Sequence, residues 1–208
     1  MQIDVAKQIG AVTRSVTTRQ HEGKAASVVM ATQTYSTTPD DLWDAVTSPE
    51  RLPRWFLPIT GDLKLGGRYQ LQGNAGGTIL VCDRPRHLKV TWEYGGEVSW
   101  VDVTIEPAPN HRTTLTLEHM AHVSDERAKQ FGPGAVGIGW DLTFVGLERH
   151  VGGSMKSPGE GMQWMMSEEG KTFMRQSNEG WYRASVASGT DPGQAKAAAD
   201  RCIAAYGG

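Results

Sequence analysis

One histidine of this sequence stands in a position where it could do chemistry. From Thr113 to His119 polar and apolar residues alternate, so Leu115 and Leu117 point to one side of an expected strand. The period of two residues places His119 on that same side. A histidine there could orient a polar group of a ligand, or act as an acid or base near neutral pH. It could equally be a hydrogen-bonded core histidine, or one that emerges at the end of the strand.

Two carboxylates are further polar candidates. Asp141 lies near the start of an expected long helix and could face His119 across a cavity. A carboxylate near a helix start is also favoured by the helix dipole at the surface, and we expect this surface position for Asp141. Asp102 shares one side of its expected strand with Trp100 and is a weaker candidate for a polar lining residue.

Aromatic side chains are the other candidate ligand contacts. Trp55 and Phe56 stand side by side in the stretch SPERLPRWFLP, between prolines that prevent a continuous helix. They could guard the entrance of a cavity or plug one end of the core. Core packing is the default role of the remaining residues, and the lining of a cavity would be an additional one. The candidate ligand-binding set is completed by Tyr69, Trp92, Tyr94, Trp100, Leu117, His119, Trp140 and Phe144.

Metal, nucleophile and phosphate sites find little support. His119 and His122 come nearest to a metal pair, but positions i and i+3 of a strand face opposite sides, so we expect no metal. No Gly-x-Ser-x-Gly motif occurs, and Cys82 stands among apolar strand residues, where a thiol is usually inert. The glycine-rich run 132–139 lacks the Lys-Ser/Thr of a P-loop. We interpret its glycines as close packing of a helix on the sheet, and expect no cofactor.

The composition is that of an ordinary globular chain. Of its 208 residues 38% are hydrophobic and 21% charged, and the net charge is −2. No charge excess attracts nucleic acid or an anionic membrane. The two cysteines, Cys82 and Cys202, are far apart and have no Cys-x-x-Cys neighbour, which speaks against a disulfide framework. No run approaches the ~18 apolar residues of a membrane span, and no apolar signal core begins the chain, so we expect a cytoplasmic protein.

The candidate residues fall mainly on an expected antiparallel meander. Ranges 11–20 and 25–36 read as extended segments. A helix starts at Thr38-Pro39 and ends near Thr47, and a second, short helix begins at Ser48. Alternation between glycine turns then predicts strands near residues 69–71, 90–94 and 113–119. A further strand follows the turn before residues 78–82, and residues 98–106 are apolar on both parities, which fits a strand covered on both faces. A long helix follows, opened by the glycine-rich run and stopped by Gly152-Gly153.

Beyond residue 159 the pattern is helical. Apolar residues recur there at helical spacing, namely Met162, Met166, Phe173 and Trp181. We expect a break near Gly170 and a last helix, capped by Asp191, that ends near Tyr206. Unpaired, the apolar positions would form an exposed patch that soluble monomers rarely tolerate. We therefore expect this region to pack on the core or on a second subunit.

Several short motifs follow one another in a characteristic order. They are Trp43-Asp-Ala-Val-Thr47 with Pro49-Glu-Arg-Leu52, Arg54-Trp-Phe56, Gly66-Gly-Arg-Tyr69, Cys82-Asp-Arg-Pro85 with Val90-Thr-Trp92, Thr114-Leu-Thr-Leu-Glu-His119 and Gly139-Trp-Asp-Leu142. As a set they resemble the START-like (SRPBCC) superfamily, and within it proteins similar to the C-terminal domain of the heat-shock-chaperone ATPase activator. The resemblance covers roughly residues 25–152. It implies an α+β helix-grip fold in a domain of residues 1–153, with a curved antiparallel sheet around the long helix and an apolar cavity between them. Residues 154–208 look like a helical extension carried by many bacterial members.

The resemblance allows three functions. The favoured one is binding of a small hydrophobic or amphipathic molecule in the cavity, without assured catalysis, because apolar and aromatic candidates predominate over polar ones. A cyclase or dehydratase acting on an aromatic or polyketide-like substrate is the second, with His119 as acid or base and Asp141 or Tyr94 assisting. A protein-interaction module similar to the chaperone activator is the third. The expected partner is a small hydrophobic molecule, not nucleic acid, and a homodimer stays open.

Overall fold

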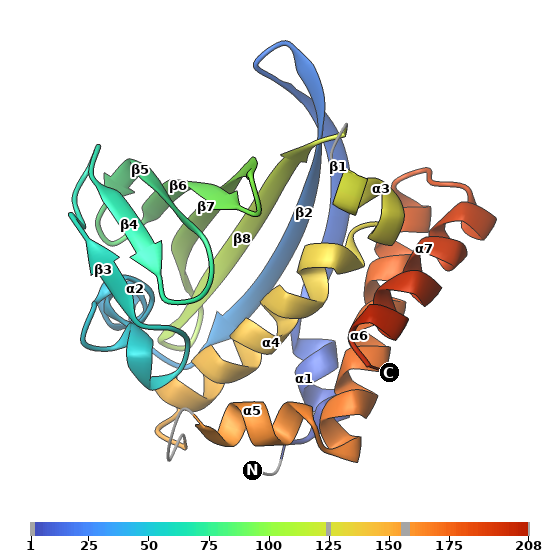
Figure 1. The fold of residues 1–208 in the computed structure, drawn as a ribbon. Helices are drawn as coiled ribbons and strands as arrows, with labels where there is room; N and C mark the ends of the chain where they lie inside the picture. The colour runs from blue at the N-terminus through green and yellow to red at the C-terminus, as the bar shows by residue number, and fades with distance from the viewer. Residues whose placement is uncertain (1–2, 124–125, 155–158, 208) are drawn as a thin grey trace. The chain divides into compact units, whose positions relative to one another are not determined.

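The computed structural model describes residues 3–123, 126–154 and 159–207. Its strands form one sheet in the order β1-β2-β8-β7-β6-β5-β4-β3 (Figure 1). The strands are β1 (Thr13–His21), β2 (Lys24–Tyr35), β3 (Ile59–Gly61), β4 (Arg68–Leu71), β5 (Gly76–Asp83), β6 (His87–Tyr94), β7 (Glu97–Ala108) and β8 (Arg112–His122). The helices are α1 (Val5–Ala11), α2 (Pro39–Thr47), the 3-10 helix η1 (Leu52–Arg54), α3 (Glu126–Phe131), α4 (Gly134–Val151), α5 (Gly159–Met165), α6 (Glu168–Ala187) and α7 (Pro192–Ala205). This is the α+β class that the sequence predicts.

The chain divides into two compact units. Unit 1 comprises residues 1–31, 120–143 and 159–208, and unit 2 comprises residues 32–119 and 144–158. Three elements, β2, β8 and α4, contribute residues to both units. The C-terminal extension is therefore grouped with the N-terminal hairpin, and a domain boundary after residue 153 stays a prediction. No helix of the described ranges is long and apolar enough to cross a membrane.

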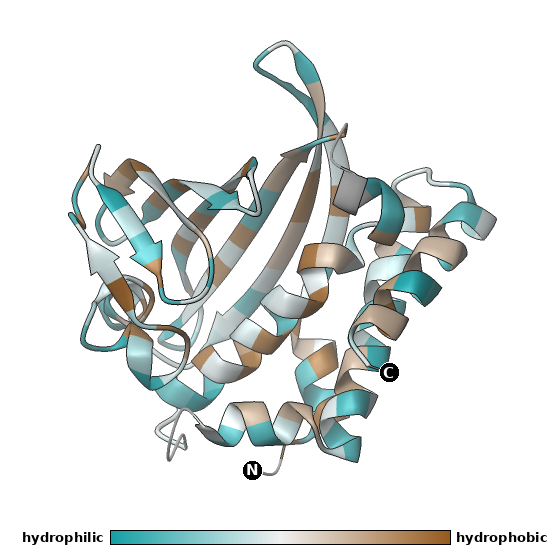
Figure 2. Ribbon diagram, in the orientation of Figure 1, coloured by the Kyte–Doolittle hydropathy of each residue, from teal (hydrophilic) through white to brown (hydrophobic). Residues whose placement is uncertain are grey.

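Unit 2 is built on an antiparallel meander whose two faces differ. On β6 and β7 the register pairs Val90 with Val101 and Trp92 with Ser99. Paired residues of antiparallel strands point to the same side of the sheet. Figure 2 shows hydrophobic residues of β8 separated by more hydrophilic ones. One side of the sheet carries these two residue pairs of β6 and β7, together with Leu115, Leu117 and His119 of β8. We call this side the inner face.

Within unit 2, the C-terminal part of α4 (residues 144–151) lies on the inner face. Two threonine pairs, Thr32 with Thr116 and Thr34 with Thr114, join β2 to β8 on the opposite, outer face. Gln33 and Tyr35 of β2 therefore point inward. There the Gln33 amide donates to Glu148 of α4, and the Tyr35 ring meets the Phe144 ring edge-on at 6.3 Å.

The short helices of unit 2 follow their capping signals only in part. The hydroxyl of Thr38 accepts a hydrogen bond from the Asp41 amide, which confirms the expected start of α2. The second helix is shorter and later than expected, because residues 49–51 form a turn and η1 begins at Leu52. Pro53 fits the start of this helix, where no amide donor is required.

In unit 1 the glycine-rich start of α4 packs against the C-terminal helices. A Cβ atom on Gly137 would lie 2.4 Å from the Trp181 ring of α6, and one on Gly134 would lie 2.9 Å from the Cys202 sulfur of α7. The glycines do provide close packing, but within unit 1 their neighbours are α6 and α7, not the sheet strands expected from the sequence. Only residues without a side chain allow this approach.

The extension breaks earlier than expected and buries half of its expected apolar positions. Ser167 caps α6 by accepting from the Gly170 amide, so the break falls at residues 166–167. Phe173 and Trp181 are fully buried. Two other positions stay exposed, Met162 at 67% and Met166 at 77%, and Trp164 is instead the buried residue of α5.

The contact of Gly137 with Trp181 yields a stability prediction. We expect Gly137→Ala to lower the free energy of unfolding by ~1–3 kcal/mol, because the added methyl group overlaps the indole ring. Gly139→Ala is the matched control, since its Cβ would lie 3.6 Å from the Tyr206 hydroxyl and alanine favours a helix by ~1 kcal/mol. Urea unfolding of both variants measures the difference. Equal stabilities would show that the indole moves aside at no cost.

Candidate functional site

His119 continues the apolar row of β8, as the alternation predicts. It is 5% exposed, beside Leu115 at 2% and Leu117 at 5%. Its Nε2 lies 2.8 Å from the hydroxyl of Ser99, and its ring meets Trp92 edge-on at 6.1 Å. The Ser99 hydroxyl also lies 3.1 Å from the Trp92 carbonyl oxygen, to which it can donate. The inner face thus carries an imidazole anchored by a hydrogen bond.

The aromatic candidates on the strands divide between the two faces. Trp92 is half-buried on the inner face, whereas Trp100 pairs with Thr91 and so lies on the outer face with Asp102. These two tryptophans therefore cannot line one pocket together. Asp102 is held by His87, whose Nε2 lies 2.8 Å from its carboxylate.

Two tyrosines of unit 2 have different surroundings. Tyr69 is buried, and its hydroxyl donates to the Thr91 carbonyl oxygen at 2.8 Å. Burial raises the pKa of Tyr69 well above its ordinary value. Tyr94 lies at the end of β6 and is 47% exposed.

Trp55 is anchored between two helices of unit 2. Its indole Nε1 donates to the Ala45 carbonyl oxygen of α2 at 3.0 Å. The ring stacks on Phe56 at 5.6 Å and on His150 of α4 at 6.3 Å. Gly146 makes room for the backbone of Trp55, since a Cβ there would lie 2.9 Å from the Trp55 carbonyl oxygen.

Asp141 is buried, so the expected surface position is wrong. Its carboxylate accepts hydrogen bonds from Arg14 of β1 at 2.8 Å and from Trp181 of α6 at 3.1 Å, and a further, short one from Ser177 of α6. Arg14 in turn donates to the carbonyl oxygens of Ile9 and Val12. One carboxylate therefore joins α4, β1 and α6 within unit 1.

Burial dominates the electrostatics of this carboxylate. It raises the pKa of Asp141 above the ordinary value, although the charge and hydrogen bond of Arg14 act in the opposite direction. The helix-dipole argument failed because the helices of the extension cover this turn of α4 in unit 1. Trp140, next to Asp141, is also buried in unit 1, at 8% exposure.

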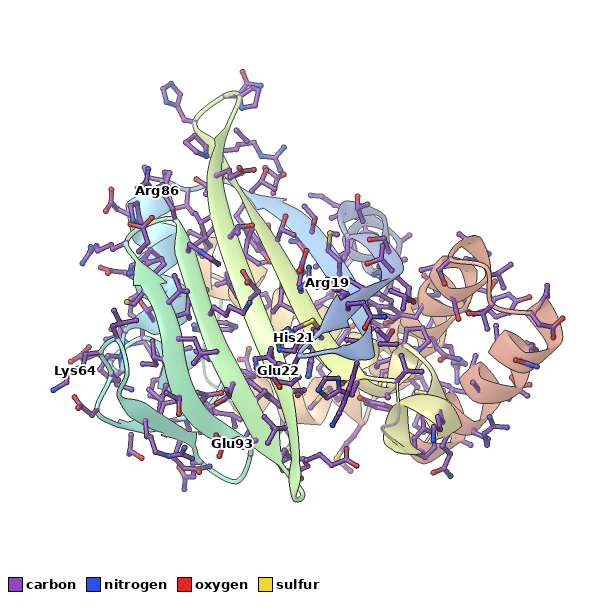
Figure 3. The ribbon with its side chains drawn as sticks, turned by 90° about the horizontal axis from the view of Figure 1, so that it is seen from above. Arg19, His21, Glu22, Lys64, Arg86 and Glu93 are labelled. Atoms are coloured by element: carbon purple, nitrogen blue, oxygen red, sulfur yellow. The ribbon has the colours of Figure 1, made fainter. Side chains whose placement is uncertain are left out.

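No metal centre is found in the described part of the chain. No group of three or more His, Cys, Asp or Glu residues is arranged to hold an ion there. In unit 1 the His122 ring lies 6.0 Å from the ring of His21, which Figure 3 labels on β1 beside Arg19. Cys82 is exposed, not enclosed by apolar neighbours as expected.

Sequence reasoning missed several residues of these networks. Ser99 interrupts an apolar row with Val101 and Val103 as His119 does on β8, so the same alternation could have found it. Ser177 and Trp181 are four residues apart on one helix face, which is a usable signal. Nothing in the sequence indicates that Arg14 pairs with a carboxylate 127 positions later.

Comparison with known proteins places this architecture in a family. The family described as "Activator of Hsp90 ATPase homolog 1-like protein" matches residues 36–152, more than half of the chain. The chain belongs to this family. The matched range contains His119, Ser99 and Trp92, but it leaves out Arg14, Ser177 and Trp181. No curated protein matches the sequence.

Solved structures confirm the predicted START-like, helix-grip fold. CalU16 from Micromonospora echinospora is similar in its crystal structure, with 29% identity, a TM-score of 0.68, and coverage of 84% of this chain and 98% of that one. The solution structure of CalU16 has 28% sequence identity and a TM-score of 0.72, and the match covers 86% of this chain and 97% of that one. Protein MLL2253 from Mesorhizobium loti gives 23% identity and 0.54, covering 61% of this chain and 98% of its own. The CalU16 match is longer than residues 1–152, so it includes part of the helical extension.

The Asp141 network yields a second stability prediction. We expect Asp141→Asn to destabilise the protein by ~3–5 kcal/mol, because it leaves the Arg14 charge buried without its counter-ion. Glu179→Gln is the matched control on α6, where the exposed ion pair with Arg183 contributes ~0–1 kcal/mol. Chemical denaturation measures both. If Asp141→Asn lowers the free energy of unfolding no more than the control does, the buried pair does not stabilise the fold.

The bond between Ser99 and His119 yields a third prediction. We expect Ser99→Ala to cost ~1–3 kcal/mol of unfolding free energy, because Nε2 of His119 loses its buried hydrogen-bond partner. In a His119→Leu background the same change should cost less, since no ring nitrogen is left without this partner. A double-mutant cycle in urea measures this coupling. Additive effects would contradict the bond.

Proposed function

We propose that the protein binds a small amphipathic molecule against the inner face of unit 2, between the sheet and α4. The observation that carries this proposal is the His119–Ser99 pair, a hydrogen-bonded polar group set in an apolar and aromatic row. Such a combination suits a ligand with a large apolar body and one polar group, because apolar walls supply affinity and a few polar contacts fix orientation. Trp92 would contact the ligand beside the imidazole.

A reaction on the same ligand is the second candidate. The observation that favours it is the anchored ring of His119, whose Nε2 lies 2.8 Å from the Ser99 hydroxyl. An imidazole held in this way can accept or return a proton near neutral pH. Asp141 does not assist in this proposal, because Arg14, Ser177 and Trp181 already engage its carboxylate.

The family description favours a third role, contact with a chaperone ATPase. Exposed apolar residues at the β6–β7 hairpin, Tyr94 at 47% and Val98 at 50%, would serve such a contact. Stimulation of chaperone ATP hydrolysis by the purified protein would separate this role from ligand binding.

Ligand binding is testable with an amphipathic probe. We expect anilinonaphthalene sulfonate, an aromatic body with one anionic group, to bind the protein with enhanced fluorescence. His119→Leu should weaken this binding at least tenfold, because one charge-assisted hydrogen bond is worth ~1.5–3 kcal/mol. Thr116→Val is the matched control, since Thr116 lies on the outer face of the same strand. Unchanged affinity in His119→Leu, or equal losses in both variants, would count against the inner face as the site.

A further inference from the structure

Three stacked rings join the segment after α2 to the C-terminal half of α4. Phe56, Trp55 and His150 follow one another with interplanar angles of 29° and 26°. Trp55 is held on its other edge by the Ala45 carbonyl oxygen. The last ring of the stack, that of His150, is the one that changes charge near neutral pH.

Arg51 makes a second connection through the same histidine. Its Nε donates to Nε2 of His150 at 3.2 Å, and its Nη1 donates to the Asp41 carboxylate at 2.8 Å. A histidine nitrogen can accept from a guanidinium only when it carries no proton. The bond therefore exists only with a neutral imidazole. Protonation removes the acceptor and places a second positive charge against Arg51.

The charges around His150 favour its neutral form. Arg51 and Arg54 face it from the segment around η1, and Asp41 faces it from α2. On α4 itself, Glu148 bonds Gln33 and Arg149 bonds the Ser154 carbonyl oxygen. Burial lowers the pKa of His150, and the two arginine charges lower it further than Asp41 raises it.

The sign of the pH effect follows from this lowered pKa. In the unfolded or released segment His150 titrates near its ordinary pKa of ~6.5. The interaction is complete above that value and weakens as the pH falls below it, because the released form binds the proton more readily. Asp41 stays ionised through this range, since hydrogen bonds from Thr37 and Arg51 outweigh its burial and lower its pKa.

The position of the segment gives this chemistry a consequence. α2 contacts β7 of the sheet, and Trp55 lies on Gly146 of α4. Residues 39–56 therefore connect the sheet with the helix that lies on its inner face. Under the proposed function, a molecule that enters between the sheet and the helix at this end would meet this segment.

We propose that Arg51, Trp55 and His150 form a proton-controlled latch, which holds residues 51–56 on α4 and releases them when His150 is protonated. Release would ease access to the inner face, and this consequence alone rests on the proposed ligand-binding function. The latch itself requires only the contacts within unit 2.

The indole proton of Trp55 reports on the latch directly. Its exchange with solvent is followed by ¹H–¹⁵N NMR and expressed as a protection factor, relative to free indole at the same pH. We expect protection to fall at least tenfold between pH 7.5 and pH 5 in the wild-type protein. His150→Gln should keep its protection at pH 5, because the amide oxygen can still accept from Arg51 and takes up no proton.

Two arginine variants separate the hydrogen bond from the charge. Arg51→Gln removes the donor, so protection should be low at both pH values. Arg54→Gln is the matched control, since Arg54 donates to the Glu50 carbonyl oxygen and not to His150. It should keep the pH response and move its midpoint to higher pH. Wild-type protection that stays constant with pH, or falls equally in His150→Gln, would overturn the latch.

The rate of anilinonaphthalene sulfonate binding tests the consequence. We expect faster binding at pH 5 than at pH 7.5 in the wild type, but equal rates in His150→Gln. If each protein binds the probe equally fast at pH 5 and at pH 7.5, while the protection of the Trp55 proton still falls with pH in the wild type, protonation does not control access to the inner face. A response of the Trp55 proton without any probe binding would refute the proposed ligand site and leave the latch intact.

Discussion

Unit 1 depends on one interaction, the buried ion pair between Arg14 and Asp141 with its hydrogen bonds. A charge that is fully removed from water needs both a counter-ion and hydrogen bonds, or its burial becomes prohibitively costly. Arg14, Ser177 and Trp181 supply these from two elements that are distant in sequence. Replacing the whole group with apolar residues of equal volume could preserve the fold, but removing one partner leaves a buried charge unbalanced. The network therefore specifies one arrangement of β1, α4 and α6.

This constraint makes the C-terminal extension a structural part of the protein. α6 supplies two of the three donors to Asp141, and its Trp181 fills the space that Gly137 leaves on α4. α7 adds Cys202, whose burial raises the pKa of the thiol to about 11, so the thiol stays protonated and unreactive at neutral pH. The likeness to CalU16 also extends past the family range into this region.

Unit 2 uses a different principle. Its meander separates apolar and polar residues by strand parity, and the inner face places one hydrogen-bonded histidine among apolar side chains. Here the polar group is neutral or singly charged and has a local hydrogen-bond partner, Ser99, so it provides a polar contact at small cost to stability. Around Trp55 a second histidine serves a different purpose, because its bond to Arg51 ties two helices together and depends on protonation.

The sequence by itself determined the local features of this protein. Strand parity placed His119 beside Leu115 and Leu117, the cap at Thr38 fixed the start of α2, and the ordered motifs indicated the family, because each of these signals acts between neighbours in the chain. Tertiary structure alone decided that Asp141 is buried, that Trp92 and Trp100 face opposite sides, and which helices pack against Gly134 and Gly137. The short elements α1, β3 and α3 were also missed, since a few residues give no readable period. A carboxylate near a helix start has the same local sequence whether water or another helix covers it. Whether the carboxylate is exposed or buried depends on where a chain segment more than 30 residues away packs, and the local sequence does not specify this.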